Sequence, residues 1–200
     1  MSGRSEPRLA MATVNREPRL APTVALCLLL ATTPALASPP LELTLQGTAQ
    51  VAFTPGDDIG ALIVAAIDRA KQQILVQAYS FTHREIAEAL IAAKKRGIDV
   101  QVIADHDQDA RVATTQIGYL VERGVPLHLD AMHPAAHNKV MVIDAGGADP
   151  AVITGSFNFT HAAQYRNAEN LLILRGNPLL AEAYAANWRR HRAHSLPVRK

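Results

Sequence analysis

The sequence predicts a single α/β domain in which a mixed β-sheet is sandwiched by helices. The first half of the domain alternates short apolar runs, typical of buried strands, with segments whose apolar residues recur every three or four positions. The second half contains strand-like runs that are separated by turn residues. Strands that first alternate with helices and then follow one another directly indicate a mixed sheet between helical layers.

The N-terminal residues carry the features of a secretory signal peptide. Arginines give a positively charged start, residues 21–30 are apolar, and Ala35 and Ala37 have the spacing of a signal-peptidase site. A membrane anchor is the alternative, but the apolar run is short and contains Pro22. We therefore expect residues 1–37 to be a cleaved signal peptide, with Met1 or Met11 as the start.

Export would place the mature protein in the periplasm or outside the cell, with no stable membrane insertion after cleavage. We expect an N-terminal tail at 38–47, one domain at 48–194 and a C-terminal tail at 195–200. The only cysteine lies in the leader, so the mature chain has no disulfide. The leader holds four Arg and two Glu, a net +2, which leaves the mature part formally neutral because the whole chain is +2. Any attraction to nucleic acid must therefore come from local patches.

The first elements follow in order. Residues 49–53 predict a strand, and the turn residues 55–58 then lead into a helix over residues 59–71, where apolar positions form a helical stripe. The apolar run at 73–79 predicts a buried strand. A second helix is predicted to begin at Thr82, because Glu85 completes a capping box, and to end at residue 96 before a glycine.

The remaining elements are placed by the same signals. Glycine or proline marks the end or start of each predicted helix, and β-branched runs mark the strands. We expect strands at 98–104, 125–129, 140–143, 151–154 and 170–174, and helices at 110–123 and 178–194. The Gly/Asp/Pro-rich break between 143 and 151 predicts a hairpin.

Four polar residues flank this hairpin at positions that suit chemistry. His137 and Lys139 lie two apart, so on an extended segment their side chains share a face, and the same holds for Ser156 and Asn158. Lys, Ser and Asn can donate hydrogen bonds to an oxyanion, and an imidazole can attack or protonate. A polar strand pair that faces water is the alternative. The combination of four such groups favours a catalytic patch.

Two acidic residues complete the pattern. Glu169 begins the next strand, where its carboxylate could hold the second nitrogen of His137 and fix the tautomer, as in a catalytic triad. Asp144 ends the first hairpin strand beside a Gly-rich turn, so we expect it to shape the hairpin by local hydrogen bonds.

The order of these residues is H-x-K-x4-D followed by G-S-x-N, formed by His137, Lys139, Asp144, Gly155, Ser156 and Asn158. This pattern resembles the signature of the phospholipase D superfamily, in which Asp144 and Gly155 would be structural members. Glu169 lies where that family has an acidic partner. Residues 77–82 and 92–100 are similar to stretches of the compact bacterial nucleases of the superfamily, and the resemblance covers about residues 48–194.

The resemblance implies a phosphodiester hydrolase that needs neither metal nor cofactor. His137 would form a covalent phosphohistidine, Lys139, Ser156 and Asn158 would bind the non-bridging oxygens, and Glu169 would orient His137. One imidazole cannot be nucleophile and acid in the same step, so one signature per chain predicts a homodimer with the active site on its two-fold axis.

The expected substrate is nucleic acid, bound through its backbone phosphates. A nonspecific endonuclease that acts on DNA, and with RNA left open, fits the small size and the export signal. A phospholipase D that acts on lipid headgroups is the alternative, although the sequence has no basic amphipathic helix for a membrane surface. A non-catalytic nucleic-acid-binding module is a third reading, and the complete signature argues against it.

We predict no metal site. His133 and His137 are four apart, but Pro134 separates them, so we expect His133 to line the pocket instead of binding zinc. Alternating aspartates at 105, 107 and 109 resemble a calcium loop, but the loop lacks its glycine at Ala110 and its glutamate at Gln116.

Overall fold

The computed structural model describes residues 40–199, and the predicted signal peptide lies outside this range. An eight-stranded sheet runs through the centre of the domain, with the strand order β1-β7-β6-β5-β2-β3-β4-β8. β2, β3 and β4 are parallel to one another, and every other neighbouring pair is antiparallel. The prediction of a mixed sheet is confirmed.

The strands and helices have the following bounds. The strands are β1 (Thr48–Thr54), β2 (Gln73–Ala78), β3 (Asp99–Asp105), β4 (Leu127–Asp130), β5 (Lys139–Ile143), β6 (Ala151–Gly155), β7 (Glu169–Arg175) and β8 (Leu196–Pro197). The helices are α1 (Ile59–Asp68), α2 (Arg84–Lys95), α3 (His106–Arg111), α4 (Ile117–Glu122), α5 (His161–Tyr165) and α6 (Pro178–His194).

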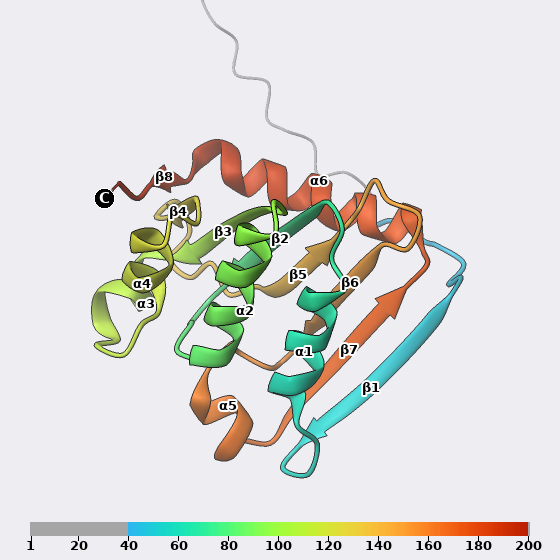
Figure 1. Cartoon of the computed structure of the whole chain (residues 1–200), viewed down its shortest axis with the longest axis horizontal. Coiled ribbons are helices and arrows are strands. Elements are labelled where there is room, and N and C mark those ends of the chain that lie inside the picture. Colours follow the sequence, from blue (N-terminus) through green and yellow to red (C-terminus); the bar gives the residue numbers. More distant parts are fainter. Residues whose placement is uncertain (1–39, 200) are drawn as a thin grey trace, which may run out of the picture. The chain divides into compact units, whose positions relative to one another are not determined.

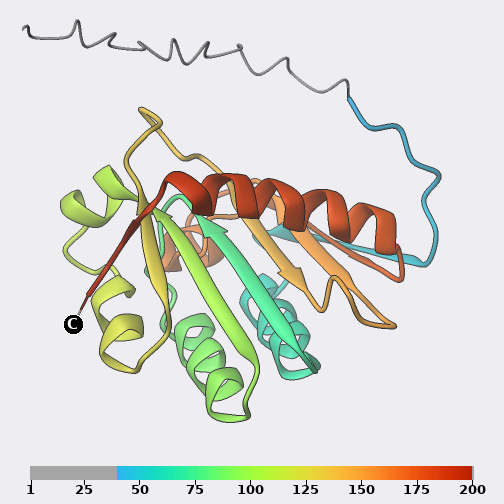
Figure 2. The same ribbon diagram turned by 90° about the horizontal axis from the view of Figure 1, so that it is seen from above.

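Helices cover both faces of the sheet, as predicted. Figure 2 shows α6 across one face and α1 and α2 on the other. Successive residues of β2 alternate between the two cores: Val76 joins the α1/α2 side, while Leu75 packs with Trp188 of α6. The indole Nε1 of Trp188 also donates to the carbonyl oxygen of Val76 at 2.9 Å, which fixes α6 against the sheet.

The sheet register brings one end of three neighbouring strands together. β5 begins beside the end of β2, with Lys139 paired to Ala78. β6 returns antiparallel to β5 and ends beside the start of β7, where Gly155 pairs with Leu171. The start of β5, the end of β6 and the start of β7 therefore lie at the same end of the sheet (Figure 1).

The predicted cap of the second helix is wrong. α2 begins at Arg84 after His83, and no side chain caps it. The backbone N–H groups of Thr82 and His83 both donate to the carbonyl oxygen of Phe159 at 2.9 Å, which holds this stretch extended. The carboxylate of Glu85 instead lies 3.0 Å from Nδ1 of the buried His83. A long-range contact has overridden the local capping signal.

The single helix predicted at 110–123 is also wrong, because α3 and α4 occupy this region as two short helices. α3 begins earlier, where the side chain of Asp105 accepts from the backbone N–H of Gln108 at 2.8 Å. The chain then breaks, and the N–H of Gln116 donates to the carbonyl of Phe81 at 2.8 Å before α4 begins.

The C-terminal residues, expected to form a tail, add a strand to the sheet. Leu196 and Pro197 form β8, which pairs antiparallel with β4. This pairing keeps the end of α6 beside β4. Within residues 40–199, no helix combines the length and the apolar character that crossing a membrane requires.

Candidate active site

His137 and Lys139 lie next to each other at the start of β5. The imidazole of His137 is exposed, whereas Lys139 is only 8% exposed. The Lys139 ammonium donates to the carbonyl oxygen of His137 at 2.9 Å, and its Nζ lies 3.1 Å from His137 Nδ1. The two side chains are together, as the spacing predicts, and the reactive ring remains accessible.

Tyr79 is a site residue to which the sequence assigned no role. Its ring centroid lies 4.3 Å from that of His137, and Lys139 Nζ lies 4.8 Å from the same Tyr79 centroid. Its hydroxyl accepts a hydrogen bond from Gln108 Nε2 at 3.0 Å. The phenol ring therefore supports both signature side chains, and its face attracts the Lys139 cation. Only the pairing of β2 with β5 reveals this contact.

Ser156 is held by two partners on β7. Its hydroxyl donates to Glu169 Oε2 at 2.5 Å and accepts from the backbone N–H of Asn170 at 3.0 Å. The other carboxylate oxygen of Glu169 accepts from Asn167 Nδ2 at 2.9 Å. The structure thus joins the predicted phosphate-binding hydroxyl to the predicted acidic residue, a contact that the sequence did not indicate.

Ser156 and Asn158 lie in a loop, because β6 ends at Gly155 instead of continuing through them. Gly155 has φ +155°, and a Cβ at this position would lie 2.3 Å from the carbonyl oxygen of Asn170. Only glycine fits this close approach of β6 to β7. The Oδ1 atom of Asn158 is buried and has no hydrogen-bond partner among residues 40–199.

The predicted contact between Glu169 and His137 is not formed in this arrangement. Within the described residues, no hydrogen bond joins the two side chains, and Lys139 occupies the Nδ1 side of the imidazole. When a protonated Lys139 donates to Nδ1, the ring of a neutral His137 carries its proton on Nε2. The role of Glu169 as the orienting residue stays a prediction.

Burial changes the acidity of the Lys139 ammonium. Desolvation lowers the pKa of its ammonium from 10.5 to about 8, and the charge of Glu169 partly opposes this change. A site that holds an ammonium with so little water around it favours an anionic ligand that restores the missing stabilisation.

Asp144 lies at the other end of β5 and serves a different segment. Its carboxylate accepts from the backbone N–H groups of Lys71, Gln72 and Gln73 at 2.7–2.8 Å. We predicted hydrogen bonds within the hairpin. The side chain instead fastens the hairpin to the start of β2, about 70 residues away in the sequence.

A cavity of about 400 Å³ lies at that far end of β5, lined by Asp144, Arg69, Lys71 and Arg175 among others. None of the predicted phosphate-binding side chains lines it. The predicted catalytic residues lie at the opposite end of the strand, so this cavity is not part of the candidate active site.

Comparison with known families and proteins finds relatives that cover most of the domain. The family model described as cardiolipin synthase, PLD-like domain, matches residues 63–191. A phospholipase D of Rickettsia felis is 37% identical over 149 residues, which are 74% of this chain and 72% of that protein. A mitochondrial cardiolipin hydrolase of Xenopus tropicalis is 32% identical, over 61% of this chain and 55% of that protein.

Two solved structures have the same fold. Nuc from Salmonella typhimurium, described as a phospholipase D family member, is 36% identical, with a TM-score of 0.71 over 76% of this chain and 99% of Nuc. NucT from Helicobacter pylori is 26% identical, with a TM-score of 0.65 over 76% of this chain and 99% of NucT.

Proposed function

This chain belongs to the phospholipase D superfamily and is a phosphodiester hydrolase, and we propose that it is a nonspecific endonuclease that cleaves DNA through a phosphohistidine intermediate. The proposal rests on one observation: the exposed imidazole of His137, the buried ammonium of Lys139 and the hydroxyl of Ser156 lie at the same end of the sheet. The domain also spans 99% of Nuc and of NucT, and this match over the full length of both proteins supports the nuclease proposal.

The first chemical step uses His137 as the nucleophile. Its unprotonated Nε2 attacks phosphorus, a P–N bond forms, and the P–O bond to the leaving alkoxide breaks. Water then attacks the phosphohistidine, the P–N bond breaks, and the second product leaves as a phosphate monoester. The exposed position of His137 allows a polymer substrate to reach the ring.

Attack through Nε2 requires the tautomer that carries the proton on Nδ1. The present contact of Nδ1 with Lys139 favours the opposite tautomer. Substrate phosphate would draw the Lys139 ammonium to its own oxygens and leave Nδ1 free to donate. Glu169, whose charge already acts on Lys139, is the acceptor we assign to that N–H.

The anionic oxygens of the transferred group need positive charge and hydrogen-bond donors. Lys139 supplies the charge, and Asn158 supplies an amide from the adjoining loop. The Ser156 hydroxyl, which donates to Glu169 in this structure, would turn its proton toward the phosphate. Burial of Lys139 strengthens its interaction with an anion because less water screens the charge.

A second histidine is required to protonate the leaving oxygen and later to take a proton from water. The chain carries one signature, so we assign this role to His137 of a second copy, in a homodimer with the site on the two-fold axis.

We also propose that the protein is exported to the periplasm or the medium. Sequencing of the N-terminus of the secreted protein would test cleavage after Ala37.

The test is cleavage of plasmid and single-stranded DNA in excess EDTA. The matched variants are His137→Ala and His106→Ala, because the exposed His106 contacts Asp107 and none of the signature residues. We expect wild type and His106→Ala to cut both substrates and His137→Ala to lose turnover while it still binds DNA. DNA binding without cleavage by the folded wild type would indicate the binding module instead.

The alternative is a phospholipase D, and the names of the curated relatives favour it. Choline release from phosphatidylcholine vesicles measures that activity under the same conditions. Release of choline that depends on His137, with no cut in DNA, would move the protein to the lipid branch and overturn the nuclease assignment.

A further inference from the structure

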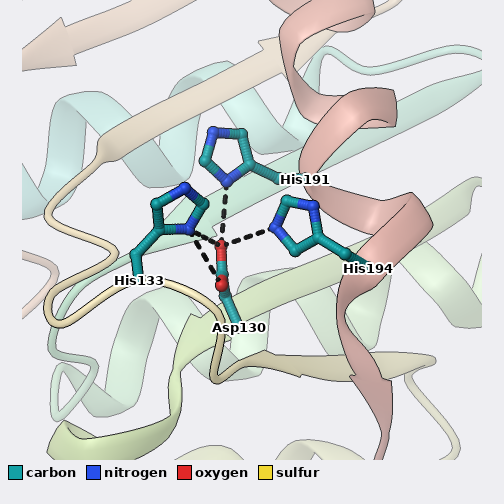
Figure 3. Close-up of side chains that lie close together, drawn as sticks. All are labelled: Asp130, His133, His191 and His194. Carbon is teal, nitrogen blue, oxygen red and sulfur yellow. Dashed lines mark hydrogen bonds and ion pairs between the residues drawn. The ribbon is translucent and has the colours of Figure 1, made fainter. Parts of the chain in front are cut away.

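Three imidazoles surround one buried carboxylate at the C-terminal end of β4 (Figure 3). Asp130 Oδ2 lies 3.0 Å from His133 Nδ1, 2.9 Å from His191 Nδ1 and 3.2 Å from His194 Nε2. The Asp130 side chain has no exposed surface, whereas the three histidines are 18–42% exposed. The imidazoles therefore close over the carboxylate on its solvent side.

The fold builds this cluster from two separate segments. Asp130 ends β4, and His133 follows three residues later within hydrogen-bond distance of it. His191 and His194 lie three apart on the last turn of α6, so they share one side of that helix. β8 pairs with β4 and holds the end of α6 beside Asp130. The backbone N–H of Met132 donates to Asp130 Oδ1 at 3.1 Å, which leaves Oδ2 to the two helical histidines.

The charge of Asp130 has an unusual set of partners. A buried carboxylate is normally paired with Lys or Arg, or it binds a metal. Among the described residues, the side-chain partners of Asp130 are histidines alone. Three neutral imidazoles and one carboxylate are a ligand set that suits zinc, whereas Mg²⁺ and Ca²⁺ prefer oxygen alone.

We propose that Asp130, His133, His191 and His194 form a binding site for a divalent transition ion, with Zn²⁺ the best match. The four ligand atoms already lie within 4.8 Å of one another. Zinc at about 2.0–2.1 Å from each tetrahedral ligand requires separations of about 3.3 Å. Small rotations of the partly exposed imidazoles close this difference, and the carboxylate stays in place.

Binding replaces N–H···O hydrogen bonds with metal–ligand bonds. Each neutral imidazole must present a lone pair at the ligating nitrogen and carry its proton on the other nitrogen. Only a ring that was imidazolium before binding releases a proton to the solvent. A cavity of about 300 Å³, lined by Asp130, His133 and Met132 among others, gives the ion a path to the site.

The ion would be structural, because four protein ligands close its coordination sphere. It would tie the loop after β4 to the C-terminal end of α6. That loop continues to His137, so the ion would also limit movement of the nucleophile's backbone. The proposed site contradicts the prediction of no metal site. Spacing along the sequence does not reveal it, because His133 is close in sequence to His137, whereas two of the proposed ligands, His191 and His194, lie about 60 residues further along the chain.

The first measurement is direct binding. Full-length protein is purified without a histidine tag, stripped with chelator, freed of the chelator and titrated with Zn²⁺ by calorimetry. We expect one ion per chain and a rise in the unfolding temperature on addition of Zn²⁺. Co²⁺ should give the visible absorption of a tetrahedral site. A folded wild-type protein that binds neither ion would overturn the proposal.

Variants locate the site. His194→Gln removes one ligand at the protein surface, Asp130→Asn removes the anionic ligand, and His161→Gln removes an exposed histidine outside the cluster. The first two should weaken Zn²⁺ binding roughly tenfold or more, and the third should leave it unchanged. Unaltered affinity in His194→Gln, which spares the buried carboxylate, would contradict the assignment even if Asp130→Asn fails to fold.

The experiments can refute the metal-site proposal and the proposed reaction independently of each other. His137→Ala should lose DNA cleavage and keep Zn²⁺ binding, because His137 is not a ligand. EDTA would also empty the metal site, so the circular dichroism spectrum in the EDTA buffer must accompany the cleavage assay. Cleavage lost together with the folded spectrum reports on the metal site, and cleavage lost by folded protein reports on the reaction.

Discussion

Lys139 has an environment unlike that of a surface lysine. It is 8% exposed, and its nearest partners are a carbonyl oxygen, an imidazole and a phenol ring, none of which is an anion. Within residues 40–199, no direct contact with a carboxylate offsets the loss of water around the Lys139 ammonium. Such a charge is stabilised fully only when a phosphate group arrives, which suits a residue that binds an anionic transition state.

The lowered pKa of Lys139 makes activity sensitive to alkaline pH. In the free enzyme the ammonium loses its proton as the pH rises through about 8, and the neutral amine cannot balance the charge on phosphate. We expect kcat/KM for DNA to fall roughly tenfold per pH unit above that value, since kcat/KM reports the free enzyme. A pH profile at constant ionic strength measures the fall.

Lys139→Arg is the control, because a guanidinium stays charged throughout this range. The variant can be slower overall, but its profile should lack the break near pH 8. The same break in the variant would assign it to another group. The stability of the fold changes with pH in the opposite direction from activity. Between about pH 8 and 10.5, Lys139 holds its proton in the unfolded chain but loses it in the folded one, so its contribution makes the free energy of unfolding rise with pH.

At the residue scale, the sequence predicts a contact correctly where residue spacing alone determines the direction in which two side chains point. A period of two places His137 beside Lys139, and the structure shows that contact. Tyr79 and the bond between Ser156 and Glu169 could not be predicted this way, because they depend on which strands are neighbours. Strand order is set by the packing of the whole sheet.

The end of β6 is the element whose geometry depends most on one residue. Gly155→Ala would place a methyl group 2.3 Å from the Asn170 carbonyl oxygen, at a φ of +155° that side chains rarely adopt. We expect the free energy of unfolding to fall by about 1–3 kcal/mol, because β6 must move away from β7. Urea unfolding followed by circular dichroism measures this change.

Gly118→Ala is the matched control on α4. A Cβ at Gly118 meets no atom within 4 Å, and alanine has the higher helix propensity. This variant should be neutral or more stable by up to about 1 kcal/mol. If the two substitutions had equal effects, the close approach of β6 to β7 would not be the cause.

Among the elements, those that local pattern governs were predicted well. The hairpin of β5 and β6 and the helix that begins at Pro178 appear as expected. The cap of α2 and the break between α3 and α4 were missed, since a carbonyl of Phe159 and one of Phe81 determine the backbone there. Local signals lose to hydrogen bonds that only the folded chain can supply.

At the scale of the molecule, the candidate active site and the histidine cluster lie at the same end of the sheet, where β2, β3 and β4 end and β5 begins. The signature residues meet where β5 begins, and the histidine cluster forms where β4 meets the end of α6. The α/β class and the covering of both faces followed from the sequence. The approach of α6 to β4 did not, because it depends on the short β8 pairing near the C-terminus.

The proposed homodimer makes a quantitative prediction about mixed subunits. If each active site needs His137 from both copies, a dimer with one His137→Ala subunit is inactive. Activity then follows the square of the wild-type fraction, so an equal mixture with complete subunit exchange retains about a quarter of the activity. Independent sites in each subunit would retain about half. Native mass spectrometry of an isotope-labelled variant confirms the exchange, and activity that declines in proportion to the wild-type fraction would refute the shared site.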